Sequence, residues 1–214
     1  LDKQPDSEVN KLRRVTILAN QSVVFTLLFQ VADLYDLLTC YEQMAINLKD
    51  QALLGKFLTV KGGCEWWIGS YDQSIQTQSR AAELCEASGD FEYAGIAYNM
   101  LQWAHLPKGD FEQVFKFKEE ALRCTEQRFN LRVYVWAFAA VSWACIFLNR
   151  WEEALENGME ALKIAEEFSD NSLISFTASV LCQAYCFKGD LNRAIEYGEL
   201  AVQKAPTPGD KIWA

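Results

Sequence analysis

Residue types suited to catalysis are scarce in this sequence of 214 residues. Histidine occurs once, at His105, and Cys145 follows forty residues later. A cysteine beside a histidine could act as a nucleophile, but nothing indicates a group that orients the imidazole or an oxyanion hole. The alternative is that both are packed residues in a column of matching positions that also holds Glu65 and Tyr185. We favour packing and expect no catalytic residues and no enzymatic activity.

The cysteines and glycines do not form a recognisable metal or phosphate motif. Among the seven cysteines there is no Cys-x-x-Cys pair, and Cys182 and Cys186 have no second pair to complete a zinc site. No Gly-rich phosphate loop is present, and Gly62-Gly63 lies inside an expected helix, where it indicates close packing. We expect no metal, no cofactor, and mostly buried, reduced cysteines of a cytoplasmic protein.

The charge balance excludes two classes of partner. Lys and Arg number 20 and Asp and Glu number 29, which gives a formal charge of −9 and a pI near 4.7. Phosphate backbones and anionic headgroups do not attract a net anion, so we expect no nucleic acid and no membrane as a partner. The most apolar stretch, from Val15 to Val31, is too short and too polar to span a bilayer and indicates a buried helix.

A repeat of forty residues is the strongest pattern in the chain. Four segments align without a gap, and they begin at Gly69, Gly109, Asn149 and Gly189. Some columns of the alignment keep one kind of residue. One column is identical in all four segments, at Ala81, Ala121, Ala161 and Ala201. Another closes each segment, at Asp90, Asn130, Asp170 and Asp210.

Each repeat is predicted to form two helices. The second helix begins after a Gly-Asp turn, where Asp110 or Asp190 can cap exposed N–H groups. Its apolar residues are spaced three and four residues apart, which is typical of an amphipathic helix. The first helix is apolar nearly all round, as in Leu131–Phe147, so it must be sandwiched between neighbours. No strand alternation is visible, and the fold class is therefore all-α.

We expect one solenoid domain over residues 1–214, as a fragment of a longer protein. Residues 1–50 would form a degenerate repeat, residues 51–90, 91–130, 131–170 and 171–210 four regular repeats, and residues 211–214 the start of a further helix.

The pattern resembles the tetratricopeptide repeat. The small residue of the family early in the second helix is matched by Ala154 and Ala194, its later alanine by the invariant alanine column, and its turn by Gly109-Asp110-Phe111. Gln102 departs from a small-residue position, and a repeat of forty exceeds the usual length of about 34 residues. The resemblance implies a right-handed α-α superhelix of about five stacked helix pairs, as in the long-repeat variants of bacterial signalling proteins. Ala205-Pro206-Thr207-Pro208 also resembles the arrays of bacterial class III nucleotide cyclases and ATPase-linked transcription regulators.

In the tetratricopeptide family, ligands contact mainly the first helices, which line a concave groove. Carrying those columns over gives a candidate ligand or peptide groove lined by Trp66, Trp67, Asn99, Trp103, Trp136, Trp143, Phe147, Gln183 and Phe187. Large aromatic residues suit an apolar peptide, a partner helix or a sugar ring, but they could also simply pack against one another. The Lys/Arg and Asn set that clamps a carboxylate in related modules is missing.

The leading hypothesis is a protein or peptide interaction scaffold, a regulatory module of a larger bacterial signalling protein. It would bind a protein, a peptide or other domains of its parent chain. A small-molecule sensor, for instance of a sugar, in a nucleotide cyclase or transcription regulator is the alternative. A structural spacer that self-associates through exposed terminal repeats is the third.

Overall fold

The computed structural model describes residues 7–20 and 30–207, and these residues form helices and turns with no strand among them. The chain divides into two compact units, Leu1–Ala104 and His105–Ala214. The all-α prediction is confirmed. None of the described helices is long and apolar enough to cross a membrane. Residues 211–214, where the start of a further helix is expected, and part of the stretch from Val15 to Val31 lie outside the described residues.

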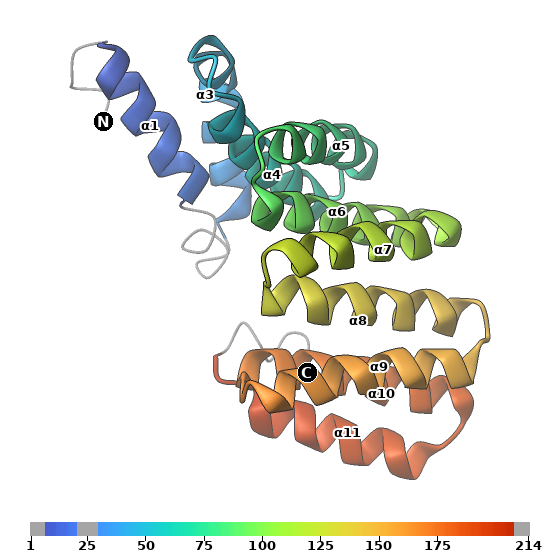
Figure 1. Cartoon of the computed structure of the whole chain (residues 1–214). Helices are drawn as coiled ribbons and strands as arrows, with labels where there is room; N and C mark the ends of the chain where they lie inside the picture. The colour runs from blue at the N-terminus through green and yellow to red at the C-terminus, as the bar shows by residue number, and fades with distance from the viewer. Residues whose placement is uncertain (1–6, 21–29, 208–214) are drawn as a thin grey trace. The chain divides into compact units, whose positions relative to one another are not determined.

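The first unit begins with α1 (Glu8–Asn20) and α3 (Val31–Asn47), both of which pack against α4 (Gln51–Trp67). α4 pairs with α5 (Tyr71–Ala87), and α6 (Phe91–His105) follows (Figure 1). The core of this unit includes the fully buried Phe57 of α4, Leu34 and Leu38 of α3, and Val15 of α1.

The second unit continues with the short 3-10 helix η1 (Leu106–Lys108) and α7 (Phe111–Gln127). α8 (Leu131–Phe147), α9 (Trp151–Glu167), α10 (Asn171–Lys188) and α11 (Leu191–Lys204) then form successive layers, with α8 against α7, α9 and α10 (Figure 1). The range predicted for the first helix of the third repeat, Leu131–Phe147, is the observed range of α8.

Helix starts recur every forty residues. First helices begin at Gln51, Phe91, Leu131 and Asn171, and second helices begin at Tyr71, Phe111, Trp151 and Leu191. The column that closes each repeat supplies the N-caps of the next first helix: Asp50, Asp90, Asn130 and Asp170 each accept a hydrogen bond from a backbone N–H three residues later. The turn between the two helices of a repeat needs a positive φ, which Gly69, Gly109, Asn149 and Gly189 adopt.

One of the two predicted second-helix caps is wrong. Asp190 accepts from the Arg193 N–H at 3.2 Å, as expected, whereas Asp110 makes no side-chain cap hydrogen bond. The Asp110 carboxylate instead lies 3.2 Å from Nδ1 of His105, so its oxygen is drawn back across the turn and away from the first N–H groups of α7.

Small residues let the helices approach closely. The four alanines of the invariant column, Ala81, Ala121, Ala161 and Ala201, are completely buried. Buried serines join neighbouring helices: Ser74 donates to the Gly62 carbonyl at 2.8 Å and Ser142 donates to the Ala154 carbonyl at 2.7 Å. A Cβ added at Gly62 would lie 2.7 Å from the Gln78 side chain, which confirms that Gly62 is a close-packing point. For Gly63 the prediction is wrong, because a Cβ there would meet no described atom within 4 Å.

Candidate functional site

Exposed aromatic rings recur at the C-terminal ends of three first helices. Trp67 ends α4, Phe147 ends α8 and Phe187 lies one residue before the end of α10. Their exposed fractions are 42%, 53% and 64%, and they occupy one column of the repeat, in which Pro107 is the fourth member. A single exposed aromatic residue is ordinary, but the same repeat position is exposed once in the first unit and twice in the second, which indicates that each unit keeps this position available.

Around Phe147 the second unit holds a small aromatic cluster. The Phe147 ring stacks on Phe111 with centroids 6.1 Å apart, and Trp143, one turn earlier on α8, lies 6.0 Å from it. The indole Nε1 of Trp143 is buried and has no hydrogen-bond partner among the described residues. The equivalent position on α10 is Gln183, which is half-buried. In this cluster the exposed ring of Phe147 packs on the half-buried rings of Phe111 and Trp143.

A second aromatic contact connects the two first helices of this unit. Trp136 of α8 and Phe176 of α10 lie 5.9 Å apart, and the Arg132 guanidinium is 5.6 Å from the Trp136 ring. Trp136 is half-buried, so it packs between helices and also presents an edge to the surface.

The candidate residues of the first unit are more tightly packed. Trp66 lies edge to face against Trp67 at 5.2 Å and against Trp103 at 6.3 Å, and its Nε1 donates to the Trp103 carbonyl at 2.8 Å. Asn99 is only 2% exposed, and its amide donates to Oε1 of Gln102 at 3.1 Å. Trp66 and Trp103 are half-buried, so Trp67 is the one exposed member of this group.

His105 and Cys145 do not form a nucleophile pair. His105 is paired with Asp110 and stacks on Phe117, with ring centroids 5.7 Å apart. The Cys145 thiol donates a long, weak hydrogen bond to Oε2 of Glu153, at 4.0 Å. Burial, and then the Glu153 charge, raises the pKa of Cys145 to about 11, whereas a nucleophilic cysteine needs a lowered pKa.

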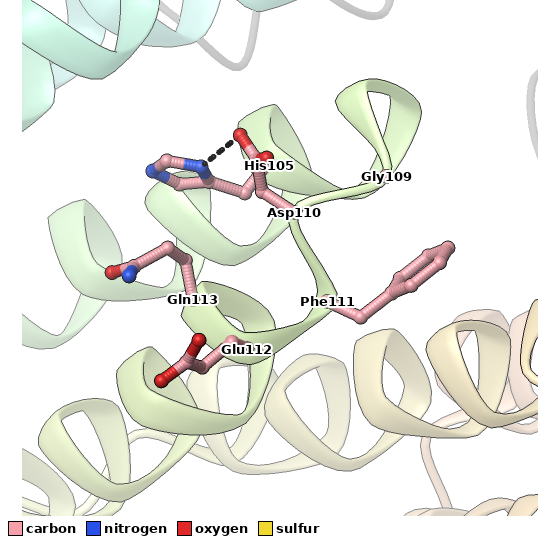
Figure 2. Close-up of a pocket in the computed structure, with 6 residues that line it drawn as sticks. All are labelled: His105, Gly109, Asp110, Phe111, Glu112 and Gln113. Atoms are coloured by element: carbon pink, nitrogen blue, oxygen red, sulfur yellow. Dashed lines mark hydrogen bonds and ion pairs between the residues drawn. The ribbon is translucent and has the colours of Figure 1, made fainter.

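An open hollow surrounds the His105–Asp110 pair. It is lined by His105, Gly109, Asp110, Phe111, Glu112 and Gln113, and Phe111 points away from the pair (Figure 2). The Asp110 carboxylate orients the imidazole, which the sequence analysis missed because the contact depends on the left-handed turn at Gly109. None of the six lining residues carries a hydroxyl, thiol or amine nucleophile; the side chains in the hollow supply one imidazole, two carboxylates, one amide and the ring of Phe111.

Metal-binding groups are not gathered in the part of the chain that the structure describes. No cluster of three or more His, Cys, Asp or Glu side chains occurs there. Cys182 and Cys186 lie one turn apart on α10, and burial, followed by the proximity of Cys186, raises the pKa of Cys182. Two thiols alone do not make the closed four-ligand shell of structural zinc.

Comparison with known proteins connects the chain to helical repeat structures. No protein-family model matches the sequence, and no curated protein matches it either. Among solved structures, a Rap protein complexed with competence and sporulation factor superposes with a TM-score of 0.80 at 15% identity, over 90% of this chain and 54% of the Rap chain. This chain therefore spans about half the length of that Rap protein.

Two further structures match over most of both chains. The TPR-like repeats of a kinesin light chain from P. anserina give a TM-score of 0.64 at 12% identity, with 89% of this chain and 94% of that chain covered. BtubC from P. vanneervenii gives 0.66 at 17% identity, with 92% and 89% covered. At these identities the likeness concerns the fold alone. The chain has the fold of the TPR-like helical repeat proteins.

Proposed function

We propose that this chain is a protein- or peptide-binding repeat module that holds its ligand against the ends of its first helices. The observation that carries the proposal is the pair of exposed aromatic residues Phe147 and Phe187 in the second unit, and Trp67 holds the equivalent position in the first unit. Aromatic rings provide large contact areas at a small cost in side-chain entropy and are enriched at binding hot spots. The fold supports the proposal, since a Rap protein of the same fold was solved in complex with competence and sporulation factor.

The spacing of the rings favours an extended peptide. α8 and α10 are in direct contact, and packed helices lie about 8–10 Å apart. Phe147 and Phe187 occupy equivalent positions on these two helices, so their backbone positions repeat at about that distance. A peptide in the extended polyproline II conformation rises about 3.1 Å per residue with three residues per turn, so two apolar side chains three residues apart lie on one face, about 9 Å apart, and would match the two rings.

The cellular setting is a further part of the proposal. A regulatory module in the cytoplasm, within a larger bacterial signalling protein such as a nucleotide cyclase or an ATPase-linked transcription regulator, agrees with the Ala205-Pro206 segment and the acidic charge of −9. In such a protein the ligand could also be another domain of the parent chain. An enzymatic role is the weaker alternative, because the residues that line the hollow at His105 carry no hydroxyl, thiol or amine nucleophile.

A peptide selection tests the proposed function. Peptides would be selected from a displayed random 12-residue library on the purified chain, and the binding of one selected peptide would be measured by fluorescence anisotropy. The double variant Phe147→Ala/Phe187→Ala should bind about tenfold or more weakly, with little change in thermal stability because both rings are mostly exposed. Phe168→Ala is the matched control, since Phe168 is 55% exposed but belongs to the end of a second helix.

Two results would contradict the proposal. One is that no peptide is enriched in the selection. The other is that Phe168→Ala weakens binding as much as the double variant does.

A further inference from the structure

Two exposed phenylalanine rings stack on each other at one end of the second unit. Phe129 lies in the turn between α7 and α8, and Phe168 directly follows the last residue of α9. They are 53% and 55% exposed, and their ring centroids lie 5.4 Å apart. Figure 1 shows the two turns at the same end of the unit. Both residues are more than half exposed, so the pair forms an apolar patch of the kind that marks interaction sites.

The backbone of the α7–α8 turn differs from that of three other turns between repeats. After α3, α5 and α9 the second residue past the helix has a positive φ, as in Lys49, Gly89 and Ser169. Phe129 holds this column without a positive φ, and Arg128 before it is extended, with φ −144° and ψ 104°. A bulky side chain strongly disfavours a positive φ, so the extended turn accommodates the Phe129 ring beside Phe168.

The pair continues into a row of rings that reaches a half-buried lysine. Centroid to centroid, Phe129 lies 6.4 Å from Tyr134 of α8, and Tyr134 lies 5.0 Å from Phe138. Nζ of Lys118 on α7 lies 4.0 Å from the centre of the Phe138 ring. The inner end of the row therefore already contacts a cation through an aromatic face. At the outer end, the rings of Phe129 and Phe168 offer the same chemistry to a cation from outside the chain.

The charges beside the outer end of the row are negative. α9 carries six glutamates and one lysine, and its last turn holds Glu166 and Glu167 but no basic residue. The carbonyls at the C-terminus of a helix carry partial negative charge, so a cation is favoured there. The Tyr134 hydroxyl donates to the Glu160 carboxylate, and burial, followed by the charges of Glu160 and Glu167, raises the pKa of Tyr134. Glu167 is exposed, so its carboxylate can contact a partner.

We propose that the Phe129–Phe168 pair binds an arginine side chain from a basic segment of a partner protein. The planar guanidinium stacks on the exposed face of a phenylalanine ring, and its N–H groups donate to the Glu167 carboxylate. Arginine suits the site better than lysine, because its fork of donors pairs with a carboxylate while its plane covers a ring. The formal charge of −9 attracts a basic partner over longer distances and accelerates the encounter.

Two other occupants fit less well. An apolar segment would cover the rings, but it would desolvate the glutamates at the end of α9 without supplying a counter-charge. A second copy of the chain carries the same formal charge of −9 and the same acidic surroundings of the patch, so two copies repel one another.

The test uses the full chain and a peptide of defined chemistry. The probe is an eight-residue peptide in which glycine and arginine alternate, with a fluorescent label at its N-terminus. Anisotropy at about 0.15 M salt should show saturable binding. The same peptide with lysine in place of arginine has an equal charge, and it should bind about threefold or more weakly, because an ammonium group lacks the planar fork.

Two chain variants separate the rings from the charge. Phe129→Leu/Phe168→Leu keeps apolar side chains but removes the aromatic faces, and Glu167→Gln removes the carboxylate. Each should weaken binding of the arginine peptide about threefold or more while the helical circular dichroism spectrum is retained, because all three positions are exposed. Glu156→Gln is the matched control for the charge, since Glu156 is exposed on α9 about three turns earlier, and it should bind as the unmodified chain does.

Three outcomes would overturn the proposal. The first is no saturable binding of the arginine peptide up to about 1 mM. The second is equal binding by the unmodified chain and by Phe129→Leu/Phe168→Leu, because net charge alone would then hold the peptide. The third is tighter binding of a peptide with leucine in place of arginine, because the occupant would then be apolar.

This test is separate from that of the proposed function. Phe147→Leu/Phe187→Leu should leave binding of the arginine peptide unchanged, because these rings lie at the ends of first helices. Phe168 in turn provides the control for the peptide that binds Phe147 and Phe187. Each pair of rings is therefore the control for the other.

Discussion

Among single residues, the cysteines show how environment decides chemistry. Four of the seven, Cys64, Cys85, Cys124 and Cys145, are buried, as the sequence analysis predicted for most of them. Cys40 and Cys186 are exposed and Cys182 is half-buried, which composition could not show. The difference arises because Cys186 lies near the end of α10, next to the exposed Phe187.

The Cys64 thiol should make folding stability sensitive to alkaline pH. Burial, and then the charge of Glu65, raises the pKa of Cys64 from 9.0 to about 12. Above about pH 9 the unfolded chain releases this proton while the folded chain retains it, so the unfolded state binds fewer protons and stability falls as pH rises. The loss is about 1.4 kcal/mol per pH unit for this group between pH 9 and pH 12.

Urea unfolding from pH 7 to pH 10.5 would measure the effect, with Cys64→Ala as the comparison. The variant loses packing at every pH, because Cys64 is only 4% exposed, but it lacks the titration of the thiol. The free energies of unfolding of the two proteins should therefore converge above pH 9. Cys40→Ala is the exposed control, and its curve should stay parallel to that of the unmodified chain. Parallel curves for Cys64→Ala would contradict the prediction.

At the scale of the element, the helices were predictable because each boundary has a local chemical cause. The positive φ at Gly69, Gly109, Asn149 and Gly189 ends the first helices, and the Asp/Asn column caps the next repeat. Exposure was less predictable. α8 is apolar nearly all round, so its pattern could not show that Phe147 is exposed while Ile146 is buried. That difference depends on which neighbours cover the end of the helix.

Two glycines at equivalent positions should respond oppositely to alanine. Gly158→Ala should destabilise the chain by about 1–3 kcal/mol, because the new Cβ would lie 2.7 Å from Cδ2 of the fully buried Leu181, which must shift within the core. Gly198→Ala should stabilise it by about 0.5–1 kcal/mol, because helix propensity improves and the one neighbour among the described residues, Cys182, is 3.4 Å from the new Cβ. Chemical denaturation would measure both.

The two substitutions are chemically identical and lie in the middle of α9 and α11, so each is the control for the other. A double variant Gly158→Ala/Leu181→Ala adds a second check. Removing the leucine side chain should relieve the clash, so the effects of the two changes should be clearly non-additive. Equal changes in stability for Gly158→Ala and Gly198→Ala would show that α10 does not cover Gly158 as described.

At the scale of the whole chain, the repeat period carried the fold prediction. Helix pairs every forty residues specify an all-α repeat, and known structures of that kind match over about nine-tenths of the chain at only 12–17% identity. Such a fold requires small residues at a few columns and apolar residues at others, which many sequences satisfy. The same tolerance explains why the fold alone does not identify the ligand, since function depends on side chains that the fold does not constrain.

The state of the tryptophans can be checked on the intact protein. Trp67 is 42% exposed, whereas Trp66, Trp103, Trp136, Trp143 and Trp151 are half-buried. In a Trp213→Phe background, which confines the signal to these six residues, Trp67→Phe should remove the largest share of the emission that a collisional quencher can reach. The remaining emission should shift to shorter wavelength, because the indole that contacts the most water is gone. Trp151→Phe, the control for a half-buried ring, should change the quenching much less.

The quencher must be chosen with the charge of the protein in mind. A formal charge of −9 repels iodide, so iodide alone would understate exposure, and neutral acrylamide should give the higher quenching constant. The difference between the quenchers should shrink as salt is added, since screening removes the repulsion. If Trp67→Phe leaves acrylamide quenching unchanged, the ring at the end of α4 is covered in solution, and the aromatic column would be reduced to Phe147 and Phe187.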